Sequence, residues 1–231
     1  MKPMTEIRKD LEEYIYGCIV PQYAAFDPAH REDHAIAVIN NSMDLYRKAP
    51  EDVRTGIDPE ILFTAAACHD LGRVNGKERH HLDSGLIIRA DRRLREWFGK
   101  DEIETIAQAA EDHRASSRDI PRSIYGRIVA EADRLIDQET IIRRTILYGK
   151  SRYPEMSPED QIDRAVNHLY EKYGDSGYLK LWIPWSDNGP RLAFFRMLLA
   201  DPEATRQEVV RIWNELDGGP EHREEAPSTR K

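Results

Sequence analysis

A short apolar segment of the sequence ends in two ionisable residues, His69 and Asp70. The segment reads ILFTAAACHDLG over residues 61–72, and a helix that is apolar on all sides is typically buried on all sides. Burying an ionisable side chain is unfavourable unless the side chain is hydrogen-bonded, paired with an opposite charge or bound to a metal. His69 and Asp70 therefore require partners from elsewhere in the chain.

Further histidines and acids fall on the apolar faces of other expected helices. His34 lies on the core side of its helix, His113 ends an apolar stripe, and Asp133 shares a face with Val129 and Ile136. For one such residue alone, a hydrogen-bonded core side chain is the more usual explanation. Several of them from separate buried helices, with few basic side chains among those positions, are difficult to stabilise except around a cation.

The donor atoms of these residues indicate which cation to expect. Imidazole nitrogen and carboxylate oxygen without thiolate suit manganese, iron, cobalt, nickel or zinc, whereas magnesium and calcium normally take oxygen ligands. The two cysteines, Cys18 and Cys68, lie far apart and outside any CxxC pattern, so a thiolate zinc site is not indicated. A divalent transition metal with spare coordination positions activates water and polarises a substrate oxygen, which points to hydrolysis.

The elements that must position these residues all read as helices. Apolar residues recur at helical spacing, and no segment shows the convincing alternation that predicts a strand. Asp58 and Pro59 predict the start of the central helix, and Gly72 predicts its C-terminal cap. We therefore expect an all-α fold with helices at about residues 5–20, 27–48, 58–72, 79–98, 101–113, 123–136, 139–148, 158–173, 190–199 and 202–216.

Length and composition are those of a soluble globular protein. The 231 residues are 33% charged and 40% apolar, with a mean hydropathy of -0.69. We expect a single all-helical domain over residues 1–216, covered on one side by an aromatic connector, GYLKLWIPWSDNG at residues 177–189, and a disordered tail at residues 217–231.

Charge and hydropathy also bear on partners and location. The net charge of -8 argues against a nucleic-acid surface or an anionic membrane as the main partner, because both favour a basic face. The N-terminus lacks the apolar core of a secretion signal, and no later run of the sequence approaches the length of a membrane span. We expect a cytoplasmic protein.

The same residues carry a resemblance to a known family. The order His34, His69–Asp70 and Asp133 in a helical bundle, with HDLGR and IVAEADRL around the motif residues, resembles the HD-domain superfamily of metal-dependent phosphohydrolases over residues 28–137. The resemblance implies an HD-type bundle with additional C-terminal helices, in which these four residues ligate a divalent metal. It also implies that Asp70 bridges a second metal and helps to orient the attacking water. The GYP motif of the cyclic-dinucleotide branch is absent, so the resemblance does not imply a cyclic-dinucleotide substrate.

Two more histidines extend the resemblance to members of the superfamily with two metals. His113 stands in EDHR and His81 in HLDSGLII. His80 competes with His81 for this ligand position, because adjacent residues on a helix point about 100° apart and normally only one of them can face the metal. We prefer His81, because Gly85 four residues later matches the HxxxG pattern of the two-metal members. The implied ligands of one or two ions are His34, His69, Asp70, Asp133, His81 and His113.

The loops next to these residues are locally basic, although the whole chain is acidic. Arg73 and Lys77 follow the HD pair, and Arg114 and Arg118 follow His113. If the loops open on one mouth, these four side chains would bind the phosphate of a small substrate such as a nucleotide. The alternative for each of them is an ordinary solvated charge paired with a neighbouring acid.

The main hypothesis is a metal-dependent hydrolase that cleaves a phosphoester of a small molecule. Metal-activated water attacks phosphorus, Asp70 helps to orient that water, and Arg73 or Lys77 stabilises the developing negative charge. Two alternatives stay open. Some relatives with six ligands resemble di-iron oxygenases, which use the same side chains to activate dioxygen. The second alternative is a non-catalytic module that binds a nucleotide or a structural metal.

Overall fold

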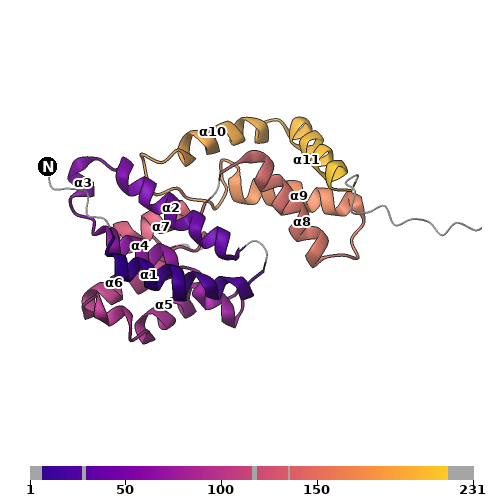
Figure 1. The fold of residues 1–231 in the computed structure, drawn as a ribbon. Helices are drawn as coiled ribbons and strands as arrows, with labels where there is room; N and C mark the ends of the chain where they lie inside the picture. Colours follow the sequence, from indigo (N-terminus) through magenta and orange to yellow (C-terminus); the bar gives the residue numbers. More distant parts are fainter. Residues whose placement is uncertain (1–6, 28–29, 116–118, 135, 218–231) are drawn as a thin grey trace, which may run out of the picture. The chain divides into compact units, whose positions relative to one another are not determined.

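The computed structural model describes residues 7–27, 30–115, 119–134 and 136–217. All regular elements of these residues are helical, so the predicted all-α fold is confirmed (Figure 1). The α-helices are α1 (Lys9–Tyr14), α2 (Glu32–Lys48), α3 (Glu51–Arg54), α4 (Pro59–Cys68), α5 (His80–Ala90), α6 (Lys100–Asp112), α7 (Ile124–Ala132), α8 (Gln138–Arg152), α9 (Pro158–Tyr173), α10 (Asn188–Leu199) and α11 (Pro202–Asp217).

The helices form two compact units. The first comprises the residues up to Arg134 together with residues 180–188, and the second comprises residues 135–179 and the residues from Gly189 onward. The single domain over residues 1–216 stays a prediction, and each unit is described by itself. The predicted tail lies outside the described residues, apart from Asp217, which ends α11. Within the described part of the chain, none of the helices combines the length and the apolarity that crossing a bilayer requires.

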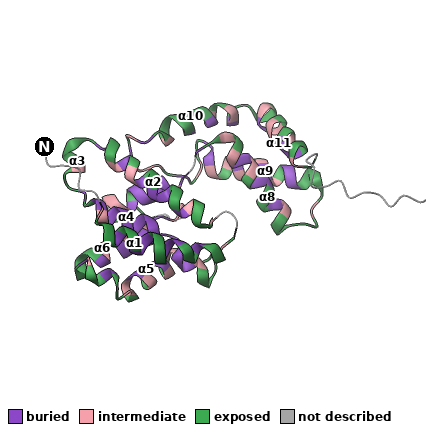
Figure 2. Ribbon diagram, viewed as in Figure 1, coloured by how far each residue is buried: buried purple, intermediate pink, exposed green. Residues whose placement is uncertain are grey.

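Helix α4 forms the centre of the first unit. All its residues from Ile61 to Cys68 are buried (Figure 2), and it packs against α2, α6 and α7. Its start is the predicted one: the Asp58 carboxylate accepts from the N–H groups of Glu60 and Ile61, and Pro59 occupies the first turn. Burying a large apolar side chain stabilises the fold by about 1.5–3 kcal/mol, and α4 contributes three such side chains, Ile61, Leu62 and Phe63.

The end of α4 differs from the prediction. The helix stops at Cys68, and the chain continues through a 3-10 turn over Leu71–Asn75, so Gly72 is not its cap. A Cβ atom on Gly72 would lie 2.1 Å from the carbonyl oxygen of His80 and 2.5 Å from the backbone nitrogen of Ser84. Glycine is needed here because the start of α5 packs directly on this turn.

Tertiary contacts also shift other predicted boundaries. The predicted helix over residues 79–98 ends at Ala90, because the Asp91 carboxylate accepts both from backbone N–H groups that follow it and, at 2.5 Å, from the Tyr14 hydroxyl. The cap of α6 is Gly99, whose N–H donates to Glu102, and not Asp101.

The chain before α2 is less regular than predicted. The expected helix over residues 5–20 is α1 followed by a π-helical turn over Ile15–Ile19 and a 3-10 helix over Val20–Ala25. Helix α2 begins at Glu32, five residues after the predicted start at Asp27. The 3-10 helix places Tyr23 in the core beside the end of α4.

Residues 180–188 of the predicted aromatic connector cover part of the first unit's core, as expected. Ile183 joins the buried cluster, and the Trp185 indole donates to the carbonyl oxygen of Leu45 at 2.9 Å. The buried carboxylate of Glu131 in α7 accepts from the N–H of Trp182 at 2.8 Å and from the side-chain amide of Asn188 at 3.0 Å. A buried acid thus ties the connector to the helix that precedes Asp133.

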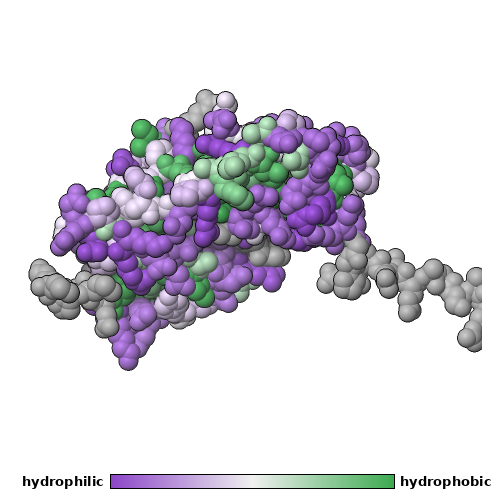
Figure 3. All heavy atoms as spheres, turned by 90° about the horizontal axis from the view of Figure 1, so that it is seen from above, coloured by the Kyte–Doolittle hydropathy of each residue, from purple (hydrophilic) through white to green (hydrophobic). Residues whose placement is uncertain are grey.

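The second unit contains α8 to α11, close to the ranges predicted for them. Helices α8, α9 and α11 pack on one another. Figure 3 shows a largely hydrophilic surface interrupted by hydrophobic side chains. On α10, Phe195 is buried, whereas Phe194 and Met197 are exposed.

Candidate metal centre

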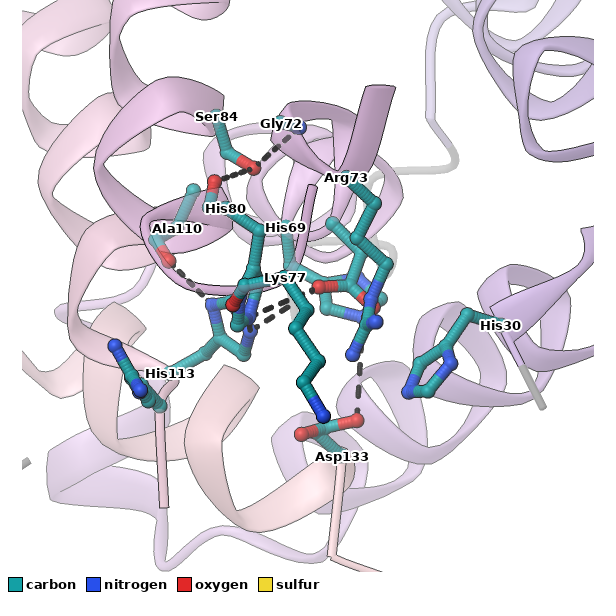
Figure 4. A network of polar contacts seen from close by, with 12 residues as sticks. His30, His69, Gly72, Arg73, Lys77, His80, Ser84, Ala110, His113 and Asp133 are labelled. Atoms are coloured by element: carbon teal, nitrogen blue, oxygen red, sulfur yellow. Dashed lines mark hydrogen bonds and ion pairs between the residues drawn. The ribbon is translucent and has the colours of Figure 1, made fainter. Parts of the chain in front are cut away.

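Six ionisable side chains of the described residues converge at the C-terminal end of α4 (Figure 4). They come from five separate segments, each at or near the end of a helix, where a side chain can turn away from the helix axis and into the interior. We call this set the His/Asp cluster; its members are His34 in α2, His69 and Asp70 after α4, His80 in α5, His113 after α6 and Asp133 after α7.

Four members form an open group: His34, His69, Asp70 and Asp133. The Nε2 atom of His34 lies 3.3 Å from Nε2 of His69, 3.2 Å from Oδ1 of Asp133 and 4.0 Å from Oδ2 of Asp70. Ligand atoms about 2.1 Å from one metal ion lie roughly 3.0–3.4 Å apart in octahedral or tetrahedral geometry. The separations of His34 from His69 and from Asp133 lie in this range, whereas those that involve Asp70 Oδ2, and the 3.9 Å between His69 and Asp133, are longer by up to about 0.6 Å.

The other members form a buried group with the second oxygen of Asp70. Oδ1 of Asp70 lies 3.4 Å from Nε2 of His80 and 3.4 Å from Nε2 of His113, and these two nitrogens lie 3.2 Å apart. Asp70 thus presents one oxygen to each group, which is the arrangement needed to bridge two ions.

In the structure His80, and not the preferred His81, lies in the cluster. His80 joins the cluster because its Nδ1 donates to the carbonyl oxygen of Lys77 at 2.7 Å, which directs Nε2 toward Asp70. Nδ1 of His81 is buried without a hydrogen-bond partner among the described residues. Gly85, taken as part of the HxxxG pattern, is small for another reason: a Cβ atom there would lie 2.3 Å from the Glu111 carboxylate.

Three of the four imidazoles are oriented by the same kind of hydrogen bond. Nδ1 of His69, His80 and His113 each donates to the carbonyl oxygen three residues earlier. A neutral ring that donates through Nδ1 has an unprotonated Nε2, and in all three rings Nε2 faces the cluster. Oδ1 of Asp70 is buried and has no hydrogen-bond partner among the described residues. Lone pairs that face one another across about 3 Å fit a divalent cation.

The pKa values of the two carboxylates also favour metal binding, because they keep both acids ionised. Burial alone would raise the pKa of Asp70, but His69, His113 and Arg73 outweigh it and hold that pKa below its ordinary value. Burial is likewise outweighed at Asp133, whose pKa is lowered by the hydrogen bond with His34 and by the neighbouring imidazoles of His69 and His113. Both acids are therefore ionised at neutral pH, as metal ligands must be.

The pKa values of the buried imidazoles shift in different directions. Burial lowers the pKa of His69 to about 4 and also lowers the pKa of His80, so these rings are neutral at pH 7. Burial opposes charge on His113 as well, but Asp70 outweighs it and raises the pKa of His113 above its ordinary value.

Solvent reaches the cluster at the open group. The side chains of Asp133 and His34 are 24% and 14% exposed, compared with 0%, 2% and 3% for His69, Asp70 and His113. A substrate would therefore approach along the edge formed by His34 and Asp133, while the buried group lies behind it.

The basic residues predicted to bind phosphate differ in their surroundings. Arg73 donates from Nε to Oδ2 of Asp70 at 2.6 Å, and its Nη1 lies 3.5 Å from Asp27. Arg73 thus positions Asp70 and also places a positive charge beside the open group. Lys77 is exposed, and Arg114 donates to the carbonyl oxygen of Glu78 at 2.7 Å. Arg118 lies outside the described residues.

Sequence reasoning missed two residues that contact the cluster. The buried Tyr23 hydroxyl donates to the carbonyl oxygen of Ala67 at 2.8 Å and accepts from the N–H of Asp70 at 3.2 Å. His30 lies edge to face on His34, with ring centroids 5.4 Å apart. The helical spacing of four between His30 and His34 was an available signal for His30, whereas no pattern in the sequence marks Tyr23.

Comparison with known proteins gives one family. A sequence model of the HD domain family matches residues 31–136. This range includes all six members of the His/Asp cluster. Searches of curated proteins and of solved structures give no significant match.

Proposed function

We propose that this protein, whose residues 31–136 belong to the HD-domain family, is a metal-dependent phosphohydrolase that acts on a small phosphorylated molecule such as a nucleotide. The observation that carries the proposal is the pair of ligand groups that share Asp70, with the open group reachable from solvent and the other enclosed. A purely structural metal site would not need an exposed edge.

The residues that would hold the metals follow from the two groups. His34, His69, Asp70 and Asp133 would hold one divalent ion, and Asp70, His80 and His113 would hold a second. Bound there, manganese, iron, cobalt, nickel or zinc would lower the pKa of water and stabilise negative charge on a phosphoryl group.

The chain's own residues would orient the reacting groups. Arg73 fixes Oδ2 of Asp70 and helps to keep that carboxylate ionised. Its contacts with Asp70 and Asp27 use only part of a guanidinium with five N–H donors, and the proposal assigns the remainder to a phosphate oxygen. Lys77, Arg114 and Arg118 would add positive charge for binding the anion.

The test removes the ligands and follows metal and turnover together. His69→Ala and Asp70→Ala should each abolish both bound metal, measured by elemental analysis, and phosphate release from a panel of phosphoesters. His168→Ala is the matched control, because this histidine lies in α9 of the second unit and should change neither quantity. A metal-depleted His69→Ala protein that keeps the wild-type rate would refute the assignment.

The shared carboxylate also favours a second candidate function. The two groups that share Asp70 would also suit iron, which could activate dioxygen there, so an oxygenase would use the same six side chains. Oxygen uptake that depends on iron, without phosphate release, would replace the hydrolase proposal. Nucleotide binding without any turnover would indicate the non-catalytic alternative.

We also propose a cytoplasmic location for the protein. Both cysteines, Cys18 and Cys68, are free thiols, as expected in a reducing compartment.

A further inference from the structure

His30 lies at the exposed edge of the His/Asp cluster, and the proposed function does not use it. Its ring meets the His34 ring edge to face, and the side chain is partly exposed. In Figure 4 the His30 ring points toward the side of the cluster where Arg73 and Asp133 lie. This is the edge by which a substrate would approach.

Asp27 fixes the orientation of the His30 ring. Nδ1 of His30 lies 2.8 Å from Oδ1 of Asp27, and an ionised carboxylate only accepts, so Nδ1 is the donor. The second oxygen of Asp27 lies 3.5 Å from Nη1 of Arg73, so the acid is held from both sides. In the neutral ring, Nε2 is then left as a hydrogen-bond acceptor.

An acceptor is chemically distinct from the other groups proposed at this edge. Phosphate oxygens at neutral pH are acceptors, and Arg73 and Lys77 supply donors to match them. Nε2 of His30 gains nothing from a phosphate oxygen and instead fits an O–H group. The part of the substrate that carries O–H groups is the alcohol that the phosphate esterifies.

We propose that His30, oriented by Asp27, accepts a hydrogen bond from a substrate hydroxyl close to the ester, so that the preferred substrates are phosphomonoesters of polyhydric alcohols, the class that includes sugar and nucleoside phosphates. This inference rests on the proposed hydrolase function and adds the substrate class. His30 is then a specificity-determining residue beside the open group.

The test compares two esters that differ in one hydroxyl, 2-hydroxyethyl phosphate and ethyl phosphate. We expect the metal-loaded, full-length protein to favour the hydroxylated ester in kcat/KM by roughly tenfold, the effect of one hydrogen bond. In His30→Leu this ratio should fall to near one, and in His30→Asn, whose amide oxygen still accepts, it should be partly restored. His168→Leu in α9 serves as the control and should keep the wild-type ratio. Elemental analysis must show equal metal content in all four proteins.

The outcomes separate this inference from the proposed function. Cleavage of both esters with a ratio that His30→Leu leaves unchanged overturns the inference and leaves the hydrolase proposal intact. If no metal-loaded form cleaves either ester or any other phosphoester, the hydrolase proposal fails. Calorimetric titration of the same two esters into the metal-loaded protein then decides the role of His30, and equal affinities in the wild type would overturn it.

Discussion

Replacing Tyr23 with phenylalanine should loosen the His/Asp cluster without altering any of its six side chains. The Tyr23 hydroxyl lies where the hydrogen-bond ladder of α4 stops, between the carbonyl oxygen of Ala67 and the N–H of Asp70. The side chain is fully buried. Burial, together with the charge of Asp70, raises the pKa of the phenol, so the hydroxyl is neutral and remains a donor.

The structure sets the size of the effect. Phenylalanine keeps the ring and removes only the oxygen, which leaves one buried carbonyl and one buried N–H unpaired. Each such group costs about 1–3 kcal/mol, so two cost about 2–6 kcal/mol. We expect about 2–4 kcal/mol, because a peptide unit at a helix end has room to rotate toward another partner. That rotation would move Asp70, and losing a group that orients a ligand lowers metal affinity by roughly 10–100-fold.

Denaturant unfolding of the metal-free protein measures the loss of stability, and titration with zinc or cobalt measures the affinity. Tyr16→Phe is the matched control, because the Tyr16 ring is partly exposed and packs edge to face on Phe63, outside the cluster. It should change stability by no more than about 0.5 kcal/mol and leave metal affinity unchanged. If Tyr23→Phe behaves like Tyr16→Phe in both measurements, the hydroxyl does not position Asp70.

His80→Ala should remove one of two ions from the reconstituted protein, whereas His81→Ala should leave the stoichiometry unchanged in elemental analysis; the reverse result would restore the sequence-based preference. Glu131→Ala should release residues 180–188 and speed their cleavage in limited proteolysis, because their hydrogen-bond acceptor is lost, while Glu131→Gln should show a smaller effect. Metal affinity should fall as the pH drops from about 8 to about 6, because the raised pKa of His113 lets a proton compete with the ion; an affinity independent of pH in this range would exclude His113 as a ligand.

Five members of the cluster were predictable from sequence for one physical reason. His34, His69, Asp70, His113 and Asp133 are ionisable residues on faces that are otherwise apolar, and a polar group in such a position needs a partner. The helical period alone therefore indicates that they face the interior. It gives no distances, and the division into two groups that share Asp70 becomes visible only in three dimensions.

Prediction of the sixth member, His80, depended on the residue at which one helix begins. Whether His80 or His81 faces the cluster is set by where α5 begins, and this start is fixed by the packing of Gly72 and by the bond from His80 to Lys77. Both contacts join segments across a turn. A repeating pattern along the sequence does not contain that information.

The contacts of Arg73 and Tyr23 were hidden for a related reason. The basic loop after the HD pair indicated positive charge near the site, but the bond from Arg73 to Asp70 depends on the 3-10 turn that replaces the predicted helix end. Tyr23 bonds to backbone groups 44 and 47 residues away. Every residue type carries these backbone groups, so no pattern of side chains in the sequence indicates which residues Tyr23 contacts.

The carbonyl groups that hold three imidazoles have a consequence for how the protein would acquire metal ions. His69, His80 and His113 are oriented by the backbone of their own segments, so their ring orientations do not depend on a bound ion. We therefore expect an ion to bind and to exchange under native conditions, without a refolding step. Because imidazole and carboxylate accept several first-row metals, we expect the identity of a bound ion to depend on the supply of metals in the surroundings more than on the fold.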